Sequence, residues 1–235
     1  MTASWEAAAL GVVEDLRNVF GNRLQSVVAY GPRVEGHDAA PLTCMVVVSS
    51  LAVADLEGCA RQTAKWHRNR LATPLVISDT ELRTSLDAFP LEYGEIIRAH
   101  RRVYGPDPFE GVTIAQPDLR RACELQIKSH LLHLREGFLE SGGEPAATAR
   151  LVAESAPAFT ALLRHVAWLS GAHTTDRLAA TRAGARATGI ADAVVADMIA
   201  LEQQPAARAS DPARLFPEYL VAVEQLARAV DTWRV

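Results

Sequence analysis

The chain has 235 residues, of which 49% are apolar and 22% are charged, and its formal net charge is −4. This length and composition are those of an ordinary globular protein with a sizeable core, and the acidic balance argues against nucleic-acid binding. The three cysteines are widely spaced and form no CxxC pair, which argues against a disulfide framework or a zinc site. No run reaches the ~18 apolar residues that would cross a membrane, so we expect a cytoplasmic protein without a membrane partner.

The first half of the chain alternates between helical and strand-like segments. Residues 45–48 are apolar at every position, which favours a strand buried on both faces. The full set of predicted elements is a helix at 3–20, strands at 24–30, 45–48 and 74–77, a helix at 52–71, a short helix from the capping box Ser78-x-x-Glu81, and a fourth strand within 91–104. This order predicts a mixed α/β domain over residues 1–112.

The second half has a different pattern, and a proline- and glycine-rich join at 106–118 separates it from the first. Apolar residues then recur every three or four positions, which is helical spacing. Helices are predicted at 118–140, 145–169, 174–187, 190–202 and 212–233. We therefore expect an all-α helical bundle over residues 113–235, whose amphipathic helices allow a homodimer or a helical protein partner.

The join between the first two strands carries a family pattern. A strand ending in Tyr30-Gly31, an x-Arg33-x-x-Gly36 turn and then an apolar strand resemble the polymerase β-like nucleotidyltransferase superfamily, in its small kanamycin-nucleotidyltransferase-like branch. A bacterial subgroup known only by its nucleotidyltransferase domain has stretches similar to residues 87–93, 100–108 and 118–139. The resemblance implies a Gly-Ser turn that holds a triphosphate and three carboxylates that hold two Mg²⁺ ions, two of them one residue apart on the second strand.

Several residues depart from that pattern. Pro32 replaces the serine, which removes a hydroxyl and a backbone N–H. Leu42 and Cys44 stand at the two carboxylate positions, where leucine offers no ligand atom and a thiol suits Mg²⁺ poorly. We therefore expect a catalytically degenerate domain with no cofactor. The alternative is an active Mg²⁺-dependent enzyme that transfers a nucleoside monophosphate to a small molecule or protein, with the loop acids Glu35 and Asp38 as the remaining carboxylates.

A role in binding stays open for the same turn. The Gly31-x4-Gly36 segment and Arg33 could hold a nucleotide or another anionic ligand, or they could form a tight turn with a solvated arginine. Arg98, His100, Arg102 and Tyr104 would share one face of the fourth strand and could also meet an anion, whereas Lys65–Arg70 is better explained as a solvated helix end. The candidate ligand-binding residues are Gly31, Pro32, Arg33, Glu35, Gly36 and Asp38.

Overall fold

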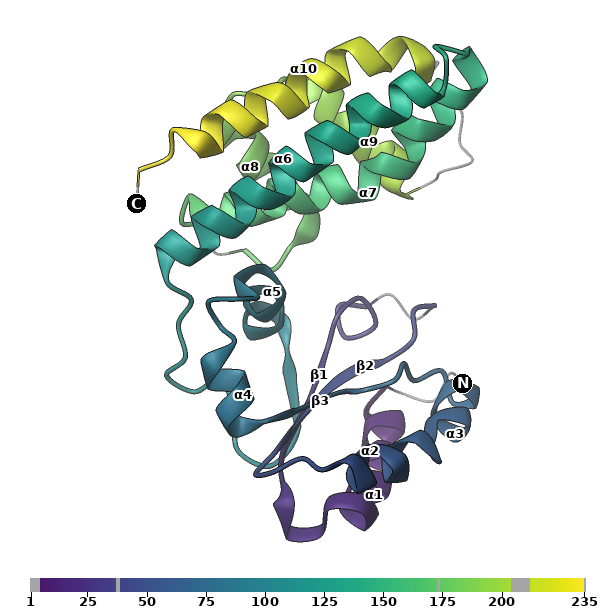
Figure 1. Ribbon diagram of the computed structural model, residues 1–235, viewed down its shortest axis with the longest axis vertical. Coiled ribbons are helices and arrows are strands. Elements are labelled where there is room, and N and C mark those ends of the chain that lie inside the picture. Colours follow the sequence, from purple (N-terminus) through teal and green to yellow (C-terminus); the bar gives the residue numbers. More distant parts are fainter. Residues whose placement is uncertain (1–4, 37–38, 173, 204–211, 235) are drawn as a thin grey trace. The chain divides into compact units, whose positions relative to one another are not determined.

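The computed structural model describes residues 5–36, 39–172, 174–203 and 212–234. It divides the chain into two compact units, residues 1–114 and 115–235. The first unit is a four-stranded mixed sheet with helices on both faces, and the second consists of packed helices (Figure 1). This architecture confirms the predicted fold class. None of the helices in the described part of the chain combines the length and the apolar character that a bilayer crossing requires.

The first unit is organised around two central strands. Its elements are α1 (Trp5–Phe20), a short 3-10 helix (Gly21–Arg23), β1 (Leu24–Tyr30), β2 (Thr43–Val48), α2 (Val53–Ala60), α3 (Thr63–Arg68), β3 (Leu75–Ser78), α4 (Asp79–Thr84), α5 (Pro90–Ala99) and β4 (Arg101–Tyr104). The sheet order is β3-β2-β1-β4. β1 pairs antiparallel with β2 and with β4, and β2 pairs parallel with β3, so β1 and β2 lie inside the sheet.

Alternate residues of β2 face different helices, because side chains along a strand point to opposite sides. Cys44, Val46 and Val48 pack in an apolar cluster with α1, α2 and α3, whereas Met45 and Val47 pack in a second cluster with α4 and α5. Every residue from 44 to 48 is buried, as the uninterrupted apolar run predicted. The face beneath α1 is therefore the one that carries positions 42 and 44.

The strand predicted within residues 91–104 is wrong over its first part. The segment up to Ala99 is the helix α5, and only the four residues of β4 pair with β1. Pro90 suits the first turn of a helix, and α5 packs Tyr93 and Ile96 in the apolar cluster that contains Met45 and Val47 of β2. The β-branched pair Ile96 and Ile97 favours a strand locally, but the packing of the apolar face of α5 on the sheet outweighs that preference.

The single helix predicted over 52–71 is two helices. α2 ends at Ala60 and α3 begins at Thr63, with a turn between them. After this break Trp66 is buried in the cluster beneath α1, and its indole Nε1 donates a hydrogen bond to Asp15 Oδ2 at 3.0 Å. A buried indole N–H needs such an acceptor, so Asp15 fixes the position of α3 against α1.

The second unit has a helix in each of the five predicted segments. They are α6 (Gln116–Glu140), α7 (Pro145–Leu169), α8 (Arg177–Thr188), α9 (Asp192–Gln203) and α10 (Pro212–Asp231). α7 contacts each of the other four and forms the centre of the bundle. The packing of α8 on α7 depends on Gly184, because a Cβ there would lie 1.9 Å from the carbonyl oxygen of Leu163.

Candidate functional site

The turn that follows β1 is a single helical turn closed by its own backbone. Gly31 has φ of +81°, a conformation that glycine adopts readily. The N–H groups of Val34 and Glu35 donate to the Gly31 carbonyl at 3.0 and 3.3 Å, and the N–H of Gly36 donates to the carbonyl of Arg33 at 3.4 Å. These three donors already have acceptors within the turn, so a phosphate group placed at this turn would have to compete for them.

Arg33 is not a solvated turn residue. Its exposed fraction is 8%, and its Nη1 donates to the carbonyl oxygen of Arg70 at 3.1 Å. The same carbonyl accepts the N–H of Leu42 at 2.9 Å. Arg70 itself has φ of +58°, and its Nη2 donates to the carbonyl oxygen of Ala39 at 2.5 Å. The end of α3 thereby ties the turn after β1 to the residues that lead into β2.

The two residues that the resemblance places at the carboxylate positions lie in the core. Leu42 and Cys44 are both 0% exposed and belong to the apolar cluster beneath α1. Burial raises the pKa of the Cys44 thiol to about 12, so the group stays protonated and neutral at physiological pH. Leucine has no ligand atom, and a neutral buried thiol does not suit a hard cation. The residues present at these positions do not fit the Mg²⁺ ions that the family pattern implies.

The acids that sequence reasoning considered as substitutes lie elsewhere. Glu35 is exposed, and Asp38 falls outside the described residues. Asp79, which follows β3, is the first residue of α4 and pairs with Arg83 at 3.1 Å. Among the residues that the structure describes, no group of three or more histidine, cysteine, aspartate or glutamate side chains could hold a metal ion.

The shared face that was expected on the fourth strand, from Arg98 to Tyr104, is not formed. Arg98 belongs to α5 and His100 follows it, so these residues and Tyr104 do not line one strand face. His100 Nε2 lies 3.2 Å from Asp107 Oδ2, which joins the end of α5 to the turn after β4. Tyr104 lies beneath the guanidinium of Arg17, 5.9 Å from its ring centroid.

A pocket of about 290 Å³ lies between α1 and α3, and Arg33 lines it. Asp15 and Lys65 are its other charged lining residues, so the two cations and one anion give the lining a net charge of +1. Lys65 Nζ pairs with Asp15 Oδ1 at 2.6 Å. Asn69 adds a polar side chain to the lining, and Gly11 of α1 lines the pocket without a side chain. This pocket collects the buried arginine of the predicted turn together with two charged residues that the prediction did not include.

One signal in the sequence concerns Asp15, although it does not say which residue pairs with it. Asp15 lies three residues after Val12 and next to Leu16, on the side of α1 that is buried, so an acid there must find partners. Lys65 was interpreted as part of a solvated helix end, and its side chain is in fact half exposed. A larger pocket, of about 650 Å³, lies at the other end of α1 and is lined mainly by polar residues of that helix, such as Glu14 and Asn18. It contains none of the residues of the predicted turn.

Comparison with known proteins identifies the fold. No protein-family model matches the sequence, and no curated protein matches it. Among solved structures, spectinomycin adenyltransferase AAD(9) from Enterococcus faecialis, determined with ATP and spectinomycin, is 13% identical. That match covers 96% of this chain and 99% of the other, with a TM-score of 0.59. A nucleotidyltransferase-like protein from Exiguobacterium sibiricum is 12% identical over 95% of this chain and 74% of its own, with a TM-score of 0.37. The first match shows that this chain has the polymerase β-like nucleotidyltransferase fold, as the sequence predicted.

Proposed function

We propose that this chain, with its nucleotidyltransferase fold, does not transfer nucleotides and instead binds a small anionic ligand in the pocket lined by Arg33. The proposal has two parts, and a different region of the first unit supports each. The residues at positions 42 and 44 support the loss of transfer. The burial of Arg33 beside an open pocket supports the binding of an anion.

Loss of transfer follows from the chemistry of two side chains. Two-metal transfer depends on carboxylates that hold the ions, and the ions supply several kcal/mol of charge stabilisation in the transition state. Leu42 and Cys44 are packed into the core beneath α1 and carry no charge. Pro32 removes one more donor that a triphosphate would use.

The burial of the Arg33 guanidinium is the observation that carries the binding proposal. A charged group taken out of water costs on the order of several kcal/mol unless an opposite charge or several hydrogen bonds compensate for it. Among the described residues, no carboxylate forms an ion pair with Arg33, and its Nη1 donates to a neutral backbone carbonyl. The carboxylate of Asp15 is already occupied by Lys65 and Trp66. An anion in the pocket would supply the missing countercharge.

The pocket also limits the size of the ligand. Pockets for drug-sized ligands measure roughly 300–1,000 Å³, and this one measures about 290 Å³. It suits a phosphate, a small phosphate ester or a small carboxylate better than a complete nucleoside triphosphate. AAD(9) was determined with ATP and spectinomycin, whereas a pocket of about 290 Å³ leads us to expect a simpler ligand here.

Calorimetric titration of inorganic phosphate and of ATP, each with and without Mg²⁺, tests the proposal. We expect binding of phosphate that does not need Mg²⁺ and that Arg33→Gln abolishes. Arg68→Gln is the matched control, because it removes one positive charge from an exposed position of α3. A second variant, Gly11→Leu, narrows the pocket without changing its charge and should weaken binding if Arg33→Gln proves unstable.

Two results would overturn the proposal. Binding of neither phosphate nor ATP would remove the anion site. Transfer of a labelled nucleoside monophosphate in the presence of Mg²⁺ or Mn²⁺, lost in Glu35→Ala or Asp38→Ala, would restore the active enzyme and place its metal at the loop acids.

A further inference from the structure

Gly11 lies inside α1, where its backbone and its neighbours give no reason for a glycine. A glycine within a helix destabilises it relative to alanine, and it is usually needed for a positive φ or for the close approach of another segment. Gly11 has no positive φ, and a Cβ there would meet no heavy atom of the described residues within 4 Å. The space beside Gly11 belongs instead to the pocket that Arg33 lines.

The pocket wall around Gly11 is apolar. Neighbours three or four positions apart on a helix share one face, so α1 turns a row of small side chains toward the pocket. The apolar side chains of the lining are Ala7, Ala8, Val12, Trp66 and Leu71. Inorganic phosphate and sugar phosphates have little apolar surface to place against such a wall, whereas a hydrocarbon chain gains free energy there.

The charges of the pocket leave one cation for the ligand. Lys65 Nζ pairs with Asp15 Oδ1 at 2.6 Å, so these two charges compensate each other. Arg33 Nη1 donates to the neutral carbonyl oxygen of Arg70. The lining therefore combines an apolar wall with one buried guanidinium.

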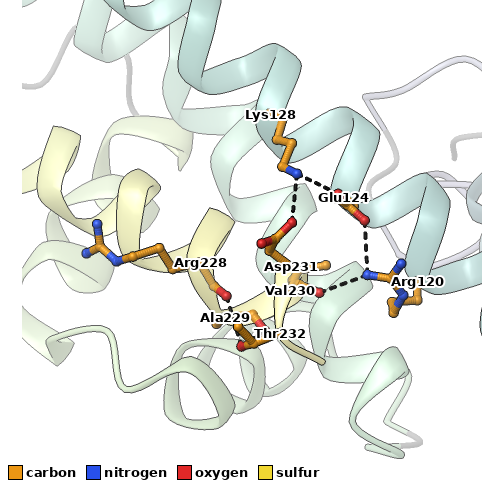
Figure 2. Close-up of polar contacts among 8 residues, drawn as sticks. All are labelled: Arg120, Glu124, Lys128, Arg228, Ala229, Val230, Asp231 and Thr232. Atoms are coloured by element: carbon orange, nitrogen blue, oxygen red, sulfur yellow. Dashed lines mark hydrogen bonds and ion pairs between the residues drawn. The ribbon is translucent and has the colours of Figure 1, made fainter. Parts of the chain in front are cut away.

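An ion pair in the second unit shows how this chain compensates a cation when an acid is at hand. Figure 2 shows Lys128 Nζ between two carboxylates, 2.5 Å from Glu124 Oε1 and 2.8 Å from Asp231 Oδ1. Lys128 is nevertheless half exposed, while Arg33 is buried. Among the described residues no acid forms such a pair with Arg33, so a carboxylate in the pocket would match its charge.

The volume of the pocket sets the length of the hydrocarbon part. At about 30 Å³ per water molecule, about 290 Å³ corresponds to about ten waters, and so to a ligand of about ten non-hydrogen atoms at most. A carboxylate group takes up part of this number, which leaves room for a short chain or a single ring.

We propose that the ligand of this pocket is a small monocarboxylate whose carboxylate pairs with Arg33 and whose hydrocarbon part packs over Gly11. The planar guanidinium suits the two oxygens of a carboxylate. This inference rests on the proposed function, because it names the chemical class of the anion that binds at Arg33.

Calorimetric titration of the full chain with acetate, hexanoate and hexan-1-ol tests the inference. A buried methylene tightens binding about fourfold, so hexanoate should bind at least about tenfold more tightly than acetate even if only two of its methylenes are buried. Hexan-1-ol carries the same chain without the charge and should bind at least about tenfold more weakly than hexanoate. Arg33→Gln should remove the difference between hexanoate and hexan-1-ol.

A second variant tests the apolar wall separately from the charge. Gly11→Leu fills the space over α1, so it should bring the ratio of the acetate and hexanoate dissociation constants close to one. The ratio is the readout, because a general weakening of binding does not change it. Asn18→Leu is the matched control: it adds a leucine at an exposed position of α1 outside this pocket and should leave the ratio unchanged.

The outcomes separate this inference from the proposed function. Acetate or phosphate binding that Arg33→Gln abolishes, with hexanoate no tighter than acetate, would overturn the inference and leave the anion site in place. Hexanoate binding that Arg33→Gln does not weaken, or a preference for hexanoate that Gly11→Leu leaves intact, would also overturn it. Binding of none of the three anions would overturn both.

Discussion

Replacing Cys44 with aspartate would restore a carboxylate at one of the two positions where the nucleotidyltransferase pattern places a metal ligand. The site is 0% exposed and lies in the apolar cluster beneath α1. Burial there raises the thiol pKa from its ordinary value of 9.0 to about 12. An aspartate with a similar upward shift of about three pKa units would destabilise the folded state by ~4 kcal/mol at pH 7. The free energy of unfolding of a native protein is typically about 5–15 kcal/mol, so such a loss is a large part of it.

The loss should depend on pH in a defined direction. A buried acid with a raised pKa binds its proton more tightly in the folded state than in the unfolded state. The charge-dependent part of the destabilisation by Cys44→Asp is therefore small below about pH 4, the ordinary range of an aspartate, and grows as the pH rises above it. Cys44→Asn has nearly the same shape without the charge, so its stability should change little over this range. The difference between the two variants isolates the cost of the charge.

Urea unfolding of both variants at pH 4 and pH 7, with and without Mg²⁺, measures this difference. We expect the aspartate variant to be less stable than the asparagine variant at pH 7 only, and Mg²⁺ to restore little of the loss. Equal stability at pH 7, or recovery of most of the loss with Mg²⁺, would refute the reasoning. Either result would mean that position 44 opens to a polar, metal-accessible site.

Three further variants test separate features. Gly184→Ala should lower the free energy of unfolding by about 3 kcal/mol or more in urea, because its Cβ would lie 1.9 Å from the Leu163 carbonyl oxygen; a neutral result would mean that α8 is less close to α7. Gly11→Ala should instead raise the Tm by removing a glycine from the interior of α1, worth ~0.5–1 kcal/mol, since its Cβ meets no described heavy atom within 4 Å. Burial lowers the pKa of His130 to about 4, and its Nε2 lies 2.7 Å from the Tyr219 hydroxyl. The stability that this neutral histidine supports is complete above about pH 6.5 and is lost as the pH falls toward 4. In His130→Gln, the free energy of unfolding should therefore fall less between pH 6.5 and pH 4, by about 3 kcal/mol at most. An unchanged pH dependence would contradict this assignment.

The fold class could be predicted because the apolar run of β2 and the helical spacing of the second half are local properties of the sequence. That residues 42 and 44 carry no carboxylate is read directly from the sequence, whereas their match to metal-ligand positions comes from the resemblance and stays a prediction. The α5 helix could not be predicted reliably, because its short segment mixes β-branched residues with a helical apolar face. The packing of that face on the sheet decides the outcome.

The burial of Arg33 and the pocket beside it depend on contacts between residues that are far apart in the sequence. Its burial is fixed by the carbonyl of Arg70, thirty-seven positions along the chain, which is available because Arg70 adopts a left-handed backbone conformation. The pocket itself needs Asp15 and Lys65 to meet across α1 and α3, fifty positions apart. Sequence reasoning identified the arginine but not these partners, because an ion pair between distant helices has no signature in either helix alone.

The hydrogen bonds at Arg70 have a consequence for how the first unit opens. One carbonyl oxygen holds both the Arg33 side chain and the N–H of Leu42, and the Leu42 carbonyl in turn accepts the N–H of Ala72 at 2.8 Å. Local unfolding of the turn after β1 would therefore weaken the start of β2 and the segment after α3 at the same time. Amide hydrogen exchange at Leu42 and Ala72 should slow when an anion binds at Arg33, although neither amide would touch the ligand. These two amides would thus report ligand binding from the residue before β2 and from the segment after α3.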